Sequence, residues 1–226
     1  MLRAATAALL DLVYPPRCGA CREHAPAGLF CAVCAEAVEP VPPGCEGCGA
    51  PGTARRCGGC LVHPPAFDRV RAGGLFGGPL ADAIHAFKYG DRPALARPLG
   101  AWLAERVGLP AGAHVVAVPL ARGRRIARGY DQAALLAGAL ARAAGARREV
   151  GLLRRIRETP PQVGRSREER ARNVAGAFAA TVAARALHLV LVDDVVTTGA
   201  TADAAARALR AAGARSVEVV ALARAE

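Results

Sequence analysis

One segment, residues 187–205, constrains the fold more than any other part of this 226-residue chain. It reads LHLVLVDDVVTTGATADAA, which is an apolar run, two adjacent carboxylates, a loop rich in threonine and glycine, and an alanine-rich stretch. Because the apolar run does not alternate with polar residues, both faces of the predicted strand should be buried, as in a parallel sheet. The segment therefore predicts an α/β sheet with a loop at the carboxyl end of this strand, where such sheets place their ligands.

The loop has the composition of a phosphate-binding site. Residues 197–201 offer consecutive backbone N–H groups and three hydroxyls, and Gly199 allows the backbone to approach a ligand closely. The helix predicted from Thr201 directs the positive end of its dipole at the same place. Asp193 and Asp194 are acceptors suited to sugar hydroxyls, and only one of them should face the sugar, because side chains alternate along a strand. An ordinary turn is the alternative. A P-loop is excluded, since no GxxxxGK[ST] motif is present.

Eight cysteines lie between residues 18 and 60 and form four CxxC pairs. Two such pairs can hold one Zn²⁺ in a tetrahedron of four thiolates, so the pattern predicts two structural zinc sites. Sequential pairing is the simpler geometry, and interleaved pairing stays open. The alternative is a disulfide framework, which suits secreted domains, but the chain start has no clear signal-peptide cleavage site. The predicted ligands are Cys18, Cys21, Cys31, Cys34, Cys45, Cys48, Cys57 and Cys60.

The remaining pattern divides the chain into three parts. Residues 1–16 fit a short amphipathic helix, residues 17–63 a double zinc ribbon, and residues 66–226 a domain of alternating strands and helices. Since the last part contains a complete pattern and no cysteine, we expect it to fold by itself. The expected strands are 69–76, 115–118, 149–153, 187–192 and 217–222, and the expected helices are 79–89, 95–107, 131–144 and 201–212.

The chain is strongly basic, with a formal net charge of +11. Eight thiolates on two Zn²⁺ would lower this charge by about four, which still favours a polyanionic partner, either nucleic acid or a pyrophosphate. No apolar run reaches the roughly 20 residues of a membrane-spanning helix. With no clear signal peptide either, we expect a cytoplasmic protein.

Three further segments carry candidate chemistry. Lys88, in FKYGD, is the only lysine among 30 basic residues, which suggests a required point charge; a solvated helix end is the alternative. Arg128, in RGYDQ, follows a predicted strand within an arginine-rich stretch, where guanidinium groups match phosphate oxygens; a solvated basic loop is the alternative. Residues 154–173 form a long loop that would close over a pyrophosphate, contact nucleic acid or stay mobile. Its candidate side chains are Arg154, Arg155, Arg157, Gln162, Arg167, Arg170 and Asn173.

These segments resemble known proteins. Residues 187–205 resemble the loop of type I phosphoribosyltransferases that binds 5-phosphoribosyl-1-pyrophosphate (PRPP). The CxxC pairs, FKYGD, VPL with RGYDQ, RETPPQ and LVDDVVTTGAT together resemble the ComF family, phosphoribosyltransferase-like proteins associated with bacterial DNA uptake in natural competence. RGYDQ stands where we expect RGFNQ.

The resemblance implies PRPP as ligand, together with Mg²⁺. It implies that Asp193 and Asp194 contact the ribose hydroxyls, and Lys88 and Arg128 are then the candidates for the pyrophosphate. The 5′-phosphate would be held by Val195, Val196, Thr197, Thr198, Gly199, Ala200 and Thr201.

Three functions stay open from the sequence. The first is a transferase that attaches the phosphoribosyl group to a nitrogen nucleophile; we identify no element that would recognise a base. The second is a DNA-uptake factor that binds single-stranded DNA or only senses PRPP. The third is a scaffold that docks a competence helicase through its zinc ribbons.

Overall fold

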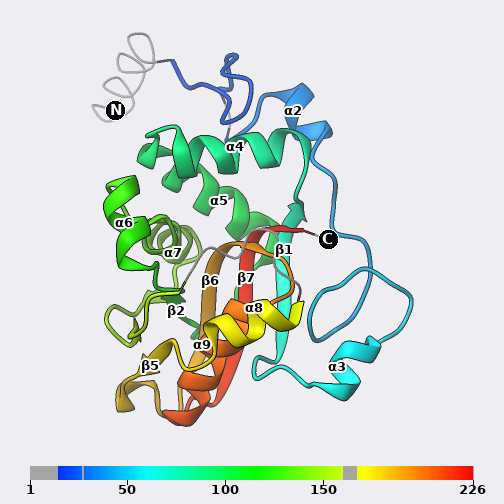
Figure 1. Cartoon of the computed structure of the whole chain (residues 1–226). Coiled ribbons are helices and arrows are strands. Elements are labelled where there is room, and N and C mark those ends of the chain that lie inside the picture. The colour runs from blue at the N-terminus through cyan, green and yellow to red at the C-terminus, as the bar shows by residue number, and fades with distance from the viewer. Residues whose placement is uncertain (1–14, 27, 160–166, 226) are drawn as a thin grey trace.

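The computed structural model describes residues 15–26, 28–159 and 167–225 (Figure 1). The predicted N-terminal helix falls almost entirely outside this range, as do Pro160, Pro161 and Gln162 of the arginine-rich loop. Within the described residues no helix is long and apolar enough to cross a membrane.

A five-stranded parallel sheet forms the centre of the fold, which confirms the predicted α/β class (Figure 1). Its order is β1-β7-β6-β2-β3, and each neighbouring pair runs parallel. The two long strands, β6 and β7, carry most of the buried apolar residues of the sheet. The bounds are β1 (Arg69–Leu75), β7 (Ser216–Arg224), β6 (His188–Val196), β2 (His114–Ala117) and β3 (Arg147–Arg148).

Helices cover both faces of the sheet, as the unbroken apolar run of β6 predicts. Val190 and Val192 pack with α4 (Gly78–Tyr89), α5 (Ala96–Val107) and α7 (Gln132–Ala143). Leu189 and Leu191 face the other way, toward α9 (Ala200–Ala211). The short helices are η1 (Pro93–Leu95), α6 (Arg122–Arg128) and η2 (Val182–Ala184).

The predicted strand at 149–153 is wrong in its bounds. The chain instead forms β3 and then β4 (Leu153–Arg155), because Gly151 adopts a left-handed φ of 77° and breaks the extended run. β4 pairs antiparallel with β5 (Phe178–Ala180) in a separate two-stranded sheet. Between them lies α8 (Arg167–Val174), inside the segment predicted to be a loop. Its polar sequence gives no apolar stripe from which a helix could be predicted.

The cysteine-rich part contains α2 (Ala32–Glu36), α3 (Gly58–Val62) and two isolated β-bridges. Its first half is not separate from the rest of the molecule. Leu29, Phe30 and Cys34 share one buried cluster with Leu80 and Ile84 of α4, and Phe30 contacts Trp102 edge-on at 5.9 Å between ring centroids. Cutting the chain at residue 66 would expose this shared core, which argues against independent folding of residues 66–226.

Candidate functional site

The loop after β6 is shaped to receive an anion. Gly199 precedes the first residue of α9 and adopts φ of 78°, a left-handed conformation that favours glycine. The first N–H groups of α9 have no partner within the helix and face the loop with the positive end of the helix dipole. A small cavity of about 30 Å³ is lined by Asp193 and residues 195–202. Every residue predicted to hold the 5′-phosphate, from Val195 to Thr201, therefore lines one cavity.

Two arginines from distant segments hold this loop. Arg224, at the carboxyl end of β7, is 7% exposed and donates hydrogen bonds to the carbonyl oxygens of Thr197 and Val196. Arg170 of α8 donates to the Thr197 hydroxyl at 2.9 Å. Arg170 therefore lies at the loop after β6 in this structure. Arg224 was not among the predicted site residues.

The two adjacent aspartates have different surroundings. Asp193 faces the loop cavity, and its Oδ1 accepts a hydrogen bond from the Asp194 N–H at 2.8 Å. Burial and the neighbouring Asp194 carboxylate raise the pKa of Asp193 from 3.8 to about 7, against the lowering effect of that N–H and of Lys88. Asp194 points away from the cavity and is 8% exposed. Only Asp193 is thus placed to meet a ligand in the loop.

Asp194 is held in a buried polar cluster. Lys88 Nζ lies 2.9 Å from Asp194 Oδ1, and Gln132 Nε2 donates to Oδ2 at 3.4 Å. Lys88 comes from the last turn of α4, so the only lysine of the chain is paired with the carboxyl end of β6 and is not a solvated helix end. Gln132 is 3% exposed, and its Oε1 has no hydrogen-bond partner among the residues that the structure describes.

Arg128 lies at the carboxyl end of α6, beside the end of α4. Its Nη2 donates to the Tyr89 hydroxyl at 3.1 Å, and its guanidinium carbon lies 4.8 Å from the centroid of that ring. Its Nη1 is buried and unpaired in the described part of the chain. A buried cationic N–H without an acceptor is costly, so this nitrogen suits an anionic ligand.

The arginine-rich segment forms an arm around the antiparallel pair β4–β5. Arg157 donates to the carbonyl oxygens of Asn173 and Ala175, at 3.1 and 2.6 Å, and so joins the two sides of the arm. The guanidinium of Arg155 lies 5.2 Å from the centroid of the Phe178 ring. Burial and the nearby Arg124 lower the pKa of Arg155, while the charges of Glu158 and Asp193 raise it. Arg155 is therefore within electrostatic reach of the aspartate in the loop.

The cysteines form two groups of four, each with its sulfur atoms within 4.8 Å of one another. Pairing is sequential: Cys18, Cys21, Cys31 and Cys34 form one group, and Cys45, Cys48, Cys57 and Cys60 the other.

The geometry of both groups fits Zn²⁺. Cys21 and Cys31, and likewise Cys48 and Cys57, have sulfur atoms 3.7 Å apart. A tetrahedron with Zn–S bonds of about 2.3 Å needs sulfur atoms about 3.8 Å apart. Burial raises the pKa of Cys45, but backbone N–H groups directed at its sulfur outweigh this and lower it to about 6, which favours the thiolate that zinc requires.

Comparisons with known proteins agree with this architecture. A double zinc ribbon domain matches residues 9–61, and a phosphoribosyl transferase domain matches residues 130–226. The chain is 35% identical to the DNA utilization protein YhgH of Salmonella typhi, with 94% of this chain and 99% of that protein covered. It is 31% identical to Competence protein F of Haemophilus influenzae, with 92% and 97% covered. The chain belongs to the ComF family.

Membership of the ComF family confirms the resemblance drawn from the sequence motifs, and with it the pairing of a double zinc ribbon with a phosphoribosyltransferase-type domain. Part of the chain also aligns with a glutamine PRPP amidotransferase from B. subtilis. That alignment has 24% identity and a TM-score of 0.40 and covers 62% of this chain and 27% of the enzyme, which is too weak to transfer an activity.

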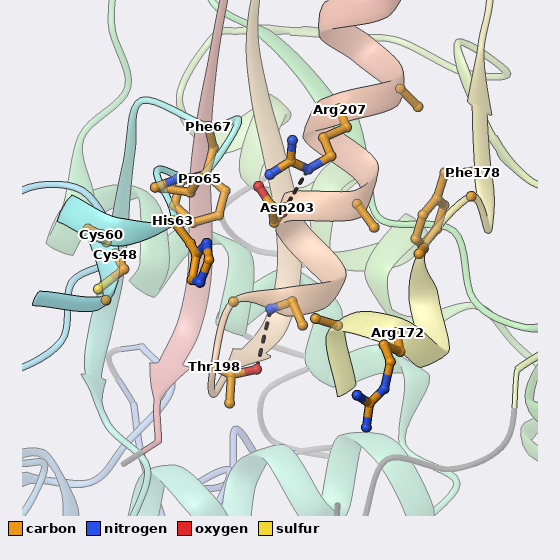
Figure 2. Close-up of a pocket in the computed structure, with 18 residues that line it drawn as sticks. Cys48, Cys60, His63, Pro65, Phe67, Arg172, Phe178, Thr198, Asp203 and Arg207 are labelled. Carbon is orange, nitrogen blue, oxygen red and sulfur yellow. Dashed lines mark hydrogen bonds and ion pairs between the residues drawn. The ribbon is translucent and has the colours of Figure 1, made fainter. Parts of the chain in front are cut away.

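A larger, mainly apolar pocket of about 840 Å³ also touches the loop (Figure 2). Its walls come from the second cysteine group, α8 and α9, and it shares Thr198, Gly199 and Ala200 with the small cavity. His63 of the predicted linker points into it near Thr198 (Figure 2). The second cysteine group and α8 therefore line one pocket together with the loop after β6.

The fold brings most of the predicted ligand-binding residues together. Asp193 and residues 195–201 line one cavity, and Lys88 joins them through Asp194. Arg128 contacts Tyr89, the residue after Lys88. Sequence reasoning gave no role to Gln132 or Arg224. Their positions could have indicated a role, because each is a polar residue in an apolar segment that is expected to be buried. Gln132 is the first residue of an Ala/Leu helix, and Arg224 is the last residue of an apolar strand.

Proposed function

We propose that this ComF protein binds PRPP with Mg²⁺ and that its family chemistry is phosphoribosyl transfer to a nitrogen nucleophile. The observation that carries the proposal is the preformed loop: Gly199 opens the amino end of α9 toward a cavity that Asp193 also lines. A phosphate group accepts hydrogen bonds from consecutive backbone N–H groups, and a carboxylate accepts them from ribose hydroxyls. Both acceptors and donors are present at the carboxyl end of a central strand.

In this proposal each group of the site has a separate task. Residues 195–201 hold the 5′-phosphate, and Asp193 accepts from the ribose. Asp194 acts through Lys88, which it holds 2.9 Å away beside the site, so that a positive charge faces the ligand from α4. Arg128, with its buried and otherwise unpaired Nη1, takes the pyrophosphate.

Phosphoribosyl transfer develops opposite charges on the ribose and the pyrophosphate, and these residues can stabilise both. When a nitrogen nucleophile displaces pyrophosphate from C1, positive charge develops on the ribose and negative charge on the leaving group. The Asp193 carboxylate lies on the ribose side, and Lys88 and Arg128 lie on the pyrophosphate side. Asp193 would also help to hold Mg²⁺, because its carboxylate lines the loop cavity. When bound, Mg²⁺ would neutralise part of the charge of the pyrophosphate.

We also propose that the protein acts in DNA uptake. Relatives carry the names DNA utilization protein and Competence protein F, and from these names we propose an association with DNA uptake for this chain as well. Two groups of four cysteines arranged to hold zinc, and not paired as disulfides need, suit a reducing compartment, so we include the cytoplasm in the proposal. The formal charge of +11 favours a second candidate, a non-catalytic factor that binds single-stranded DNA or docks a helicase and uses the fold as a scaffold.

The experiment is a calorimetric titration of the zinc-loaded protein with PRPP and Mg²⁺, in wild type and two matched variants. Asp193→Asn should weaken binding by roughly 10- to 150-fold, the worth of one charge-assisted hydrogen bond. Glu46→Gln makes the same chemical change at an exposed ion pair with Arg55 on the zinc ribbon, and binding should stay within twofold of wild type. If folded wild type does not bind PRPP, the scaffold candidate becomes the better account. If Asp193→Asn binds PRPP as tightly as Glu46→Gln does, Asp193 does not contact the ribose.

A further inference from the structure

Tyr89 is far more exposed to solvent than the other aromatic residues that the structure describes. Aromatic residues make up 4% of the sequence, and within the described ranges every Phe, Tyr and Trp except Tyr89 is buried or half-buried. Tyr89 is 70% exposed. Its ring contributes little to the core at this exposure, so packing does not explain an aromatic residue at this position.

Tyr89 belongs to a row of π-systems along the exposed side of α4. The ring of Phe76, just after β1, lies 5.7 Å from His85, and His85 lies 6.2 Å from Tyr89. The Arg128 guanidinium continues the row, 4.8 Å from the centre of the Tyr89 ring. A planar cation against one side of a 70%-exposed ring leaves much of that ring open to solvent. The hydroxyl bond to Arg128 also fixes the ring orientation.

The row runs beside the candidate site. α4 crosses the carboxyl end of the sheet and ends next to α6 (Figure 1). Lys88, the residue before Tyr89, reaches Asp194 on β6, next to the aspartate that lines the loop cavity. Arg128, which contacts Tyr89, is the residue that we assign to the pyrophosphate. Under the proposed function, Tyr89 therefore lies at the edge of the ligand site, one residue after Lys88 and in contact with Arg128.

A fixed aromatic ring with an adjacent guanidinium is the arrangement that proteins use to stack a nucleobase, because every base has a π-face and Arg adds a cation–π contribution. We propose that Tyr89, oriented by Arg128, is a stacking subsite for an unpaired nucleobase. Its place beside the ribose rests on the proposed function. The base has two sources of the same chemistry: a free heterocycle that acts as the nitrogen acceptor, or a base within a single strand of DNA.

The test uses full-length, zinc-loaded protein and three probes. They are a panel of free purine and pyrimidine bases with PRPP and Mg²⁺, a fluorescently labelled oligodeoxythymidylate, and an abasic oligonucleotide of the same length and charge. Tyr89→Leu keeps the bulk and removes the ring, whereas Tyr89→Phe keeps the ring and removes the bond to Arg128. Val182→Ala, at an 86%-exposed side chain on η2, is the control.

Loss of the ring should weaken base binding by roughly 5- to 150-fold, the effect of removing one base–aromatic stack. Tyr89→Phe and Val182→Ala should stay within about threefold of wild type, and binding of the abasic strand should not depend on the ring. Sensitivity of the free bases identifies an acceptor subsite, and sensitivity of the oligonucleotide alone identifies a strand-binding one. The inference is overturned if no base-containing probe binds wild type, or if Tyr89→Leu binds as wild type does.

PRPP titration of the same variants separates this inference from the proposed function. If PRPP fails to bind wild type, the proposed function fails, but the oligonucleotide still reports on stacking. If PRPP binds and base binding ignores the ring, only the stacking inference fails.

Discussion

The neighbouring aspartates Asp193 and Asp194 should respond to the same substitution with opposite signs. Asp193→Asn removes a charge that burial and Asp194 make unfavourable, so it should stabilise the folded protein above neutral pH. Asp194→Asn leaves Lys88 without its partner in a site where the two side chains are 15% and 11% exposed, so it should destabilise the protein.

The pH dependence follows from the raised pKa of Asp193. Below pH 3.8, the pKa of Asp193 in the unfolded chain, the Asp193 carboxyl is protonated in both the folded and the unfolded protein and does not affect stability. As pH rises toward about 7, the unfolded chain loses this proton while the folded protein retains it. The wild-type protein therefore loses stability as pH rises from about 4 to about 7, and the loss stays constant at higher pH. With about 1.4 kcal/mol for each pKa unit, Asp193→Asn should gain at most about 2 kcal/mol at pH 5.5 and about 4 kcal/mol at pH 8.5. Asp194→Asn should cost about 2–3 kcal/mol, below the cost for a fully buried pair.

Urea unfolding of wild type and both variants, followed by circular dichroism at five pH values from 5.5 to 8.5, measures these changes. We expect the stabilisation by Asp193→Asn to grow by about 2 kcal/mol over this range. A stabilisation by Asp193→Asn that does not change with pH would refute the conclusion that the charge of Asp193 is unfavourable in the folded protein. Destabilisation by Asp193→Asn at pH 8.5 would refute it as well.

Three further predictions concern the zinc ribbon and the loop. Elemental analysis should find about two Zn²⁺ per chain, and a chelator should lower the melting temperature of the whole chain; metal-free folded protein would contradict this. Residues 66–226 expressed alone should be unstable, and in the full chain Leu29→Ala should cost about 2–5 kcal/mol in urea unfolding, whereas Leu61→Ala, at a 66%-exposed side chain, should cost almost nothing. Equal costs would show that the ribbon does not share the core. Gly199→Val should weaken PRPP binding at least tenfold by calorimetry, because valine cannot adopt φ of 78° without strain and its Cβ would lie 3.4 Å from Phe67; binding like wild type would remove the loop from the site.

Local chemistry made much of the fold predictable. The unbroken apolar run at 189–192 gave a strand buried on both faces, and its side chains do alternate between the two clusters of the core. Asp131 and Gly145 gave the bounds of α7 to within one residue, since Asp131 accepts from the Ala134 N–H at 2.9 Å and Gly145 takes a left-handed φ of 62°. The cysteine spacing predicted two groups of four cysteines, and the structure brings the sulfur atoms together in two such groups.

The features that sequence reasoning missed depend on contacts between distant segments. Nothing near Arg224 in the sequence shows that it reaches the carbonyl oxygens of the loop after β6. Gln132 meets Asp194 only when α7 packs beside β6. The shared core of Leu29 and α4 was missed because the ribbon has few apolar residues, and those few find partners across the predicted domain boundary. The helix α8 was not predicted because its charged sequence has too few apolar residues to show the three- to four-residue spacing that indicates a helix.

The most direct test of the central claim is a crystal structure of the zinc-loaded protein with PRPP and Mg²⁺. We expect the 5′-phosphate within hydrogen-bond distance of the backbone N–H groups of residues 197–201, ribose hydroxyls on Asp193, and the pyrophosphate near Lys88 and Arg128. Density for PRPP away from the loop, or an unliganded loop in crystals grown at saturating PRPP, would contradict the account.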